Sequence, residues 1–261
     1  MKLLPLQNPF GAPVYHEETV SSTFDAARTL AAQGEVHGTV ICTDYQEAGR
    51  GRPKPGAAEG RPWSSERGKN LLFTILLRYG SISSIPPLLT LRTGLAISKA
   101  IEDLVPALAG SVKLKWPNDV MIGPLKAAGI LTETDGSSVY IGVGVNVAQT
   151  GFPEECRFKA GSLIQACPGL DEGSRFVLLD KILVQLYVEL EREAHAGSWR
   201  EQLMERLYKK GETVIFSEGA ADSDALIEGT LSGIGPQGEI LIIPKGEEKE
   251  QAFANGELRV Y

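Results

Sequence analysis

Arginine and glycine alternate in one short segment, Gly49-Arg50-Gly51-Arg52-Pro53-Lys54-Pro55-Gly56. The surrounding residues 46–70 include six Lys or Arg and three Glu, a net charge of +3 in a chain whose total is −7. Glycine lets the backbone approach an anion, backbone N–H groups can point at phosphate oxygens, and arginine adds bidentate charge. One interpretation of the segment is therefore a cradle for a phosphate-bearing ligand.

The same segment allows two other interpretations. Runs of charge commonly form solvated surface loops. Arg50-Gly51-Arg52-Pro53 is also similar to the core of an AT-hook, whose two arginines lie in the minor groove of A·T-rich DNA. A dinucleotide fingerprint is excluded, because Lys54 replaces the third glycine of GxGxxG.

Two lysines stand where a predicted strand meets a turn. Lys115-Trp116-Pro117-Asn118-Asp119 ends one strand, and Lys126 begins an apolar strand that contains Gly129. A lysine at a strand's start can project into a cleft at the edge of a sheet, and a glycine lets a ligand pack against the backbone. The alternatives are a salt-bridged turn with Trp116 in the core and a solvent-exposed Lys126.

Glycine alternates with valine in a further predicted strand, Gly142-Val143-Gly144-Val145-Asn146-Val147. Side chains alternate along a strand, so Gly142 and Gly144 share one face. That face offers either a flat floor for a ligand or close packing for a helix.

Periodicity and turn residues predict the elements that position these segments. We expect helices over residues 23–33, 87–108, 173–195 and 198–210, and a long loop over 46–70. We expect strands over residues 38–44, 71–78, 112–116, 119–122, 127–134 and 139–147. Consecutive strands with short connections indicate an antiparallel or mixed sheet.

The composition changes near Lys210. Short β segments then alternate with glycine turns, over residues 213–216, 225–231, 239–243 and 257–261. About 50 residues of this kind are typical of a small β-barrel. We therefore predict a main domain over residues 1–210 and a second domain over 211–261.

Composition places the chain among ordinary globular proteins. Of 261 residues, 43% are hydrophobic and 23% charged, and the net charge of −7 argues against nonspecific coating of nucleic acid. Three cysteines without CxxC spacing favour a reducing compartment, and no apolar run or signal peptide predicts a membrane segment. We expect a cytoplasmic protein that does not bind a membrane. The three histidines show no metal-ligand spacing, so the metal ligands are left unassigned.

Together the motifs resemble those of the biotin protein ligases, the biotin–[acetyl-CoA-carboxylase] ligases. The resemblance covers nearly the whole chain and rests on Ser22-Thr23, Gln46-Glu47-Ala48-Gly49-Arg50-Gly51-Arg52, Gly60-Arg61-Pro62-Trp63-Ser64, Asn70-Leu71, Lys115 to Asp119, Lys126 to Leu131 and Gly142 to Asn146. It implies an α+β fold of the class II synthetase-like, biotin–lipoate ligase type. That fold is a mixed sheet flanked by helices, with a small C-terminal SH3-like β-barrel.

The resemblance also implies a two-step reaction. Biotin is activated with ATP to biotinoyl-5′-AMP, with Mg²⁺ at the phosphates, and biotin then passes to a lysine of a biotin carrier domain. The catalytic residues implied are Lys126, Arg50, Arg52 and Asp119. Residues expected to contact biotin or nucleotide are Ser22, Thr23, Gln46, Gly49, Gly51, Trp63, Lys115, Gly129, Gly142, Gly144 and Asn146.

The residues carry specific expected roles. Lys126 reaches the biotin carboxylate and the α-phosphate, while Arg50 and Arg52 hold phosphate and order a lid. Asp119 orients or deprotonates the acceptor lysine, and Trp63 covers biotin or adenine.

The chain departs from the family's pattern in two places. Seven residues, 53–59, stand where the family usually has one, which predicts a longer lid. Phe24 stands where the family commonly has a polar asparagine.

The resemblance leaves several expectations about partners and alternatives. Few residues precede the ligase pattern, so we expect a monofunctional ligase without a DNA-binding domain, and a homodimer is possible in this family. The alternatives are a lipoate–protein ligase and, from another class, A·T-rich DNA binding through residues 50–53.

Overall fold

The main sheet has eight strands. The computed structural model describes residues 1–53, 60–156, 159–192, 198–219 and 226–259. Its strand order is β1 (Lys2–Leu3), β2 (Val14–Glu17), β3 (Thr39–Thr43), β6 (Leu71–Arg78), β10 (Ser138–Val145), β9 (Leu125–Asp135), β8 (Asp119–Ile122) and β7 (Val112–Lys115). Only the β2–β3 pair among these is parallel, so the predicted mixed sheet is confirmed.

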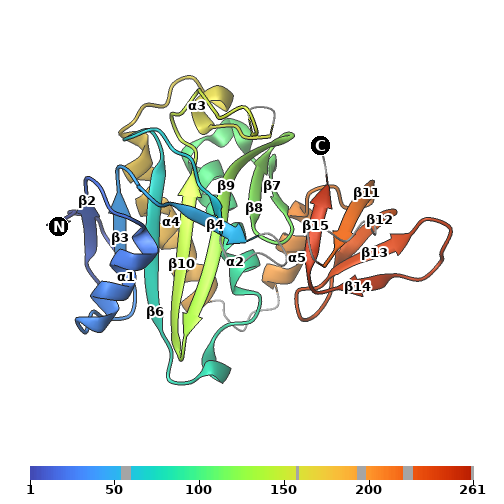
Figure 1. The fold of residues 1–261 in the computed structure, drawn as a ribbon, viewed down its shortest axis with the longest axis horizontal. Coiled ribbons are helices and arrows are strands. Elements are labelled where there is room, and N and C mark those ends of the chain that lie inside the picture. Colours follow the sequence, from blue (N-terminus) through green and yellow to red (C-terminus); the bar gives the residue numbers. More distant parts are fainter. Residues whose placement is uncertain (54–59, 157–158, 193–197, 220–225, 260–261) are drawn as a thin grey trace.

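Alternation along the strands divides the apolar side chains between the two faces of the sheet. Ile41, Leu76 and Tyr140 pack with Phe24 of helix α1 (Thr23–Ala32) on one face. Their sequence neighbours, such as Val40 and Ile75, join the larger cluster on the other face. Figure 1 shows α1 on one side of the sheet and α2 (Leu89–Leu104) and α4 (Ser174–Tyr187) on the other.

A two-stranded hairpin interrupts the predicted long loop. β4 (Arg50–Pro53) pairs with β5 (Gly60–Pro62), and β4 crosses over β10 and β9 in Figure 1. The expectation of a long loop over 46–70 was therefore wrong in this part, because neither short strand has the apolar alternation that predicts a strand. The predicted lid extension lies mostly in residues 54–59, outside the described residues.

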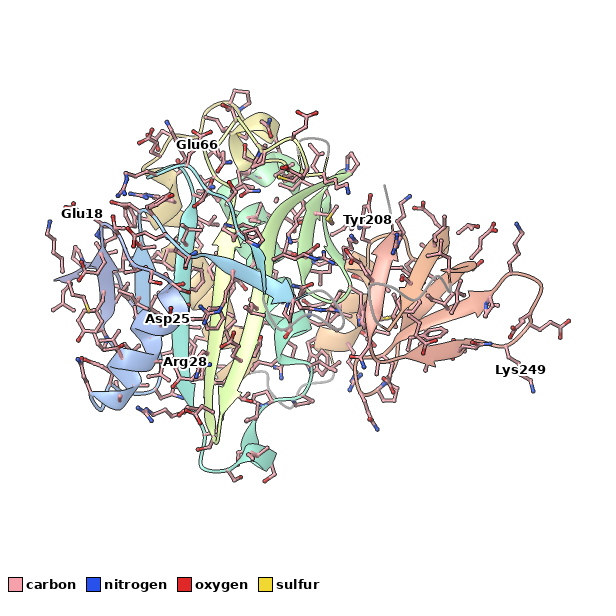
Figure 2. The ribbon with its side chains drawn as sticks, in the orientation of Figure 1. Glu18, Asp25, Arg28, Glu66, Tyr208 and Lys249 are labelled. Atoms are coloured by element: carbon pink, nitrogen blue, oxygen red, sulfur yellow. The ribbon has the colours of Figure 1, made fainter. Side chains whose placement is uncertain are left out.

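The C-terminal part forms a second, five-stranded antiparallel sheet. Its order is β14 (Gln251–Phe253), β13 (Ile240–Pro244), β12 (Leu226–Ile234), β11 (Thr213–Glu218) and β15 (Gly256–Arg259). Figure 2 shows Lys249 at the far end of this sheet, in the turn before β14. The SH3-like barrel and the domain division at residue 210 stay predictions.

The remaining elements are short or connect the two sheets. They are η1 (Ile82–Ser84), η2 (Pro106–Leu108), α3 (Leu163–Ala166), η3 (Val188–Arg192) and α5 (Ser198–Arg206). The short strands β1, β2 and β14 and the short helix α3 were not predicted. Within the described part of the chain, no helix has the length and apolar character needed to cross a membrane.

Candidate functional site

Strand register gathers the predicted glycines on one face of the main sheet. Gly144 of β10 lies opposite Gly129 of β9, which in turn lies opposite Asp119 of β8. The neighbouring row contains Thr74, Gly142 and Leu131. Residues in one row across a sheet share a face, so the four strands β6, β10, β9 and β8 contribute to one shallow floor.

Two aromatic rings cover this floor. A methyl group added at Gly144 would lie 2.6 Å from Cε2 of Trp63, and one at Gly129 would lie 2.8 Å from its Cζ3. A methyl group at Gly142 would overlap the ring of Phe24. The glycines therefore make room for the chain's own aromatic side chains, at positions where we expected a ligand.

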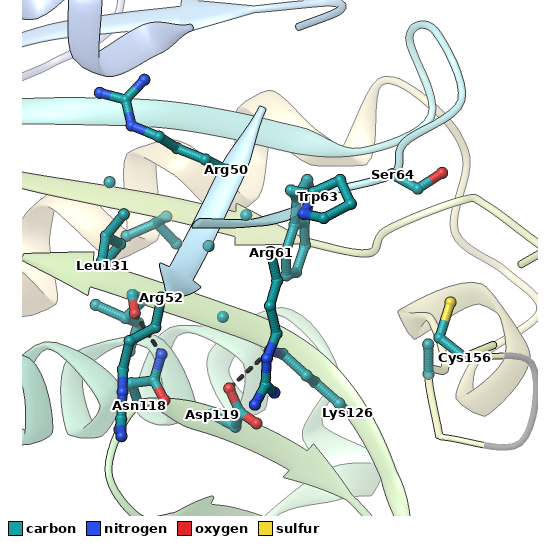
Figure 3. Close-up of a pocket in the computed structure, with 18 of the residues that line it drawn as sticks. Arg50, Arg52, Arg61, Trp63, Ser64, Asn118, Asp119, Lys126, Leu131 and Cys156 are labelled. Atoms are coloured by element: carbon teal, nitrogen blue, oxygen red, sulfur yellow. Dashed lines mark hydrogen bonds and ion pairs between the residues drawn. The ribbon is translucent and has the colours of Figure 1, made fainter. Parts of the chain in front are cut away.

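A cavity of about 730 Å³ opens above the floor. All of the predicted site residues except Ser22 and Gly49 are among the described residues that line it. Ser22 instead caps α1 by accepting a hydrogen bond from the Phe24 N–H, and the Gly49 carbonyl accepts one from the Trp63 N–H. Figure 3 shows the basic side chains that surround the cavity.

One end of the cavity carries neutral polar groups. Gln46 Oε1 accepts hydrogen bonds from the Thr23 backbone N–H at 2.8 Å and from its hydroxyl at 3.0 Å. Thr74, a fully buried residue that sequence reasoning missed, donates its hydroxyl to Thr23 at 2.9 Å. These bonds fix the orientation of the Gln46 amide. They therefore also fix the positions of its hydrogen-bond donor and acceptor groups at this end of the cavity.

Cationic groups gather near the other end. Lys126 Nζ lies 2.7 Å from Asp119 Oδ1 and 5.3 Å from the centre of the Trp63 ring, so its amine is held by a carboxylate and an aromatic face. Lys115 is 5% exposed, and burial lowers the pKa of its amine while the nearby Asp119 opposes that change. An excess of fixed positive charge at this end suits an anionic ligand.

The second sheet contributes to the same end. Arg61 of β5 makes a bidentate pair with Glu257 of β15, at 3.1 and 2.6 Å. Arg52 donates to the Gly256 carbonyl at 2.9 Å, and its burial lowers the pKa of its guanidinium. The hydrogen bond from Arg61 lowers the pKa of the Glu257 carboxyl, although partial burial opposes it. Both hairpin strands are therefore tied to β15.

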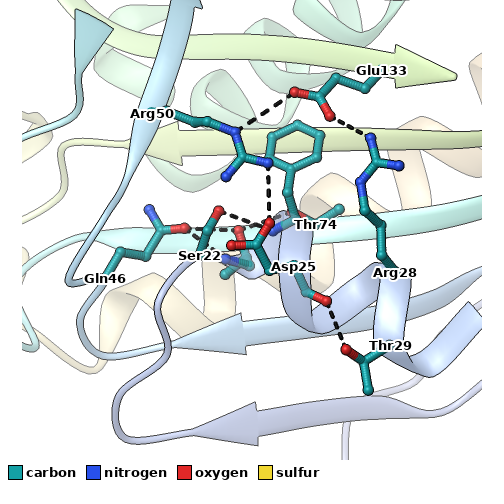
Figure 4. A network of polar contacts seen from close by, with 10 residues as sticks. Ser22, Asp25, Arg28, Thr29, Gln46, Arg50, Thr74 and Glu133 are labelled. Carbon is teal, nitrogen blue, oxygen red and sulfur yellow. Dashed lines mark hydrogen bonds and ion pairs between the residues drawn. The ribbon is translucent and has the colours of Figure 1, made fainter. Parts of the chain in front are cut away.

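Arg50 differs from the other basic residues. Its guanidinium contacts Asp25 and Glu133 (Figure 4). In Figure 3 it is directed away from Arg52, Arg61 and Lys126. Its expected role as a phosphate ligand stays a prediction.

Comparison with known proteins identifies the family of this chain. The family model of the Biotin/lipoate A/B protein ligase family matches residues 18–146. The chain is 31% identical to a biotin–[acetyl-CoA-carboxylase] ligase of Paracoccus denitrificans over 195 residues, which is 70% of this chain and 77% of that protein. The chain belongs to the biotin protein ligase family.

Other members of the biotin protein ligase family agree in sequence and fold. The bifunctional ligase/repressor BirA of Bacillus spizizenii is 37% identical over 60% of this chain, and the match covers 47% of that protein. The chain thus spans about half the length of the first curated relatives it matches. A biotin protein ligase from Aquifex aeolicus, solved with biotin and ATP, superposes with a TM-score of 0.76 at 27% identity and covers 94% of this chain and 97% of that one.

Several cavity residues of this biotin protein ligase family member escaped sequence reasoning. Glu257 and Cys156 line the cavity, and so does Arg61, which the sequence motif contained without a role. Asn146 donates its amide to the Gly161 carbonyl at 3.0 Å, which ties the end of β10 to the loop before α3. Its expected contact with nucleotide stays a prediction.

No cluster of three or more His, Cys, Asp or Glu side chains among the described residues is arranged to hold a metal ion. The acidic side chains that line the cavity there are Asp119, Glu155 and Glu257. Magnesium commonly uses one or two carboxylates together with substrate phosphates, so these residues fit an ion that arrives with a nucleotide.

Proposed function

We propose that this protein is a biotin–protein ligase that makes biotinoyl-5′-AMP and transfers biotin to a lysine of a carrier domain. The observation that carries the proposal is one cavity with a neutral hydrogen-bonding end at Thr23 and Gln46 and a cationic end at Lys115, Lys126 and Arg52. A ureido ring suits the first end, and a carboxylate meeting a triphosphate suits the second.

In the first step, a carboxylate oxygen of biotin attacks the α-phosphorus of ATP, and the bond to pyrophosphate breaks. Two anions must approach, and charge grows at the α-phosphate, so fixed cations lower the barrier. The contacts of the Lys126 amine with Asp119 and the Trp63 ring, at the floor of the cavity, support this role for Lys126. Lys115, Arg52 and Arg61 supply further positive charge toward the phosphates.

Bound Mg²⁺ would neutralise phosphate charge, with phosphate oxygens as its main ligands and Asp119, Glu155 or Glu257 as protein ligands. The protein's own task is to exclude water from the mixed anhydride. The β4–β5 hairpin lies over the floor and is tied to β15, so it can serve as that cover.

In the second step, the acceptor lysine attacks the acyl carbon, the bond to the AMP oxygen breaks, and a proton leaves the amine. Asp119 is the proposed residue that orients or deprotonates that amine. Its Oδ1 already lies 2.7 Å from the amine of Lys126, so the proposal favours orientation of the incoming amine by this carboxylate.

The decisive experiment incubates the protein with biotin, MgATP and the biotin carrier domain of a carboxylase, followed by mass spectrometry. We expect a biotin adduct on one carrier lysine, and no adduct when ATP is omitted. Absence of both the adduct and biotin-dependent ATP–pyrophosphate exchange would contradict the proposal. Calorimetry with biotin and with lipoate separates it from lipoate ligation, since the matching family includes both activities.

We also propose the carboxylase carrier domain as acceptor, a homodimer, and a cytoplasmic location without membrane or nucleic-acid binding. Three free cysteines support a reducing compartment. Sedimentation at several concentrations tests the dimer, and gel shifts with A·T-rich duplex test DNA binding.

A further inference from the structure

The Arg50 guanidinium makes three contacts, with residues of α1 and β9 (Figure 4). Its Nη2 lies 3.2 Å from Asp25 Oδ1 of α1, and its Nε lies 3.8 Å from Glu133 Oε1 of β9. The centre of the Phe24 ring is 5.4 Å from its central carbon. One side chain of β4 thus contacts a helix and a strand that β4 does not pair with.

The partners of Arg50 are themselves held in place. Glu133 Oε2 accepts a hydrogen bond from Arg28 at 2.6 Å, and the Arg28 guanidinium lies 4.8 Å from the centre of the Tyr140 ring. Phe24 is buried and lies over Gly142. Arg50 of the hairpin therefore contacts side chains that are themselves bonded to, or buried against, α1 and the main sheet.

We propose that Arg50 is a positioning residue, whose contacts with Asp25, Glu133 and Phe24 hold β4 closed over the neutral end of the cavity. The expected consequence of this anchoring, retention of the acyl-adenylate, rests on the proposed function. The anchoring itself does not depend on any activity. The hairpin then has two attachments. Arg50 holds it at the α1 side, and Arg52 and Arg61 hold it at β15.

Charge balance and direction favour anchoring over direct phosphate binding by Arg50. Two carboxylates already surround its guanidinium, and an additional phosphate there would have to displace them. Exposed ion pairs contribute individually no more than a factor of about five to an equilibrium constant. Here two pairs and an aromatic face act on one short strand, so we expect the higher end of that range.

Hydrogen exchange in the full-length protein without ligands tests the anchor directly. Glu133→Gln removes one of the two charged partners of Arg50 and is expected to accelerate exchange of peptides covering residues 46–53 and 60–64 by about three- to fivefold. Glu228→Gln is the matched control, because it removes one carboxylate from an exposed ion pair with Lys245 that involves no hairpin residue. Unchanged exchange in Glu133→Gln, or equal acceleration in Glu228→Gln, would overturn the proposal.

Kinetics then distinguish positioning from phosphate binding. Glu133→Gln and Arg50→Gln are both expected to raise the AMP released per biotin transferred, Arg50→Gln by the larger factor because it removes both ion pairs. In both variants we expect the KM for ATP in pyrophosphate exchange to stay within twofold of that of the parent protein. Arg50→Lys is expected to rescue only part of this loss, since lysine lacks the planar fork. A large rise in the KM for ATP in Arg50→Gln alone would identify Arg50 as a phosphate ligand and refute the positioning role. If the parent protein forms no adenylate, the proposed function is wrong. The hydrogen-exchange experiment still tests whether Arg50 anchors the hairpin, because it needs no activity.

Discussion

Lys126 lies among the charged and aromatic side chains that line the cavity. Its amine contacts the Asp119 carboxylate at 2.7 Å and faces the Trp63 ring, and its side chain is 29% exposed. The sequence allowed either a lysine projecting into a cleft or a solvent-exposed one, and the family resemblance assigned Lys126 to the cleft. The sequence could not predict the Trp63 contact, since that ring comes from a hairpin with no apolar alternation.

We predict that Lys126→Ala abolishes biotin-dependent ATP–pyrophosphate exchange while the protein stays folded. Removal of one preorganised electrostatic donor costs about 10²- to 10³-fold in rate in other enzymes. Exchange of radioactive pyrophosphate into ATP measures the loss, and circular dichroism checks the fold. Near-normal exchange in the variant would remove Lys126 from the proposed role.

Gly144 is predicted to tolerate no larger residue without movement of Trp63. A Gly144→Ala methyl would lie 2.6 Å from Cε2 and Cζ2 of that ring, so the indole must shift, at a cost of about 1–3 kcal/mol. Tryptophan fluorescence and thermal unfolding measure both effects. Gly80→Ala is the control, because its methyl would meet no atom within 4 Å. An unshifted emission spectrum in Gly144→Ala would contradict the close packing.

Among the elements, the β4–β5 hairpin and its attachments are the part of the site that the sequence did not predict. The paired glycine rows follow from the alternation of Gly142 and Gly144, which the sequence predicted, and from strand register, which it did not. The hairpin's attachments depend on contacts between distant residues, since Arg61 and Glu257 are 196 positions apart. Neither residue carries a local signal for that pairing, because each is a charged residue in a short polar segment.

The Arg61–Glu257 pair predicts a pH-dependent contribution to stability. The pKa of Glu257 is lowered in the folded protein, chiefly by the hydrogen bond from Arg61. A lowered folded-state pKa gives stability that is fully present above the unfolded pKa of about 4.3 and is lost as the pH falls through the folded pKa. The difference in Tm between the parent protein and Glu257→Gln should therefore be constant from pH 8 to pH 6 and shrink below about pH 4.3.

Arg61→Gln provides the control for this pH dependence. Without the guanidinium, the main cause of the lowered pKa is gone, so replacing Glu257 in that background should give a smaller and flatter Tm difference. A difference that grows as the pH falls toward 4 would contradict the assigned pair.

For the whole molecule, the two sheets share one apolar interior. Trp116 donates its indole N–H to the Gly238 carbonyl at 2.8 Å, and its ring lies 6.1 Å from that of Phe216 in β11. Phe216 is fully buried and belongs to the same cluster of side chains as the main sheet. The composition of the sequence changes near residue 210, which predicted a domain boundary there. Composition could not indicate that the hydrophobic core continues across that point.

A continuous core predicts that the two sheets unfold together. Phe216→Ala should destabilise the protein by about 3–5 kcal/mol, the usual cost of truncating a buried phenylalanine. Scanning calorimetry is expected to show one transition that moves to lower temperature as a unit. Ile215→Ala, next to it on the same strand and 44% exposed, should move that transition far less. Two transitions, of which only one responds to Phe216→Ala, would mean that the C-terminal sheet melts independently. The hairpin ties at Arg52 and Arg61 would then be lost before the main sheet unfolds, so the cavity would open at temperatures where its floor is still intact.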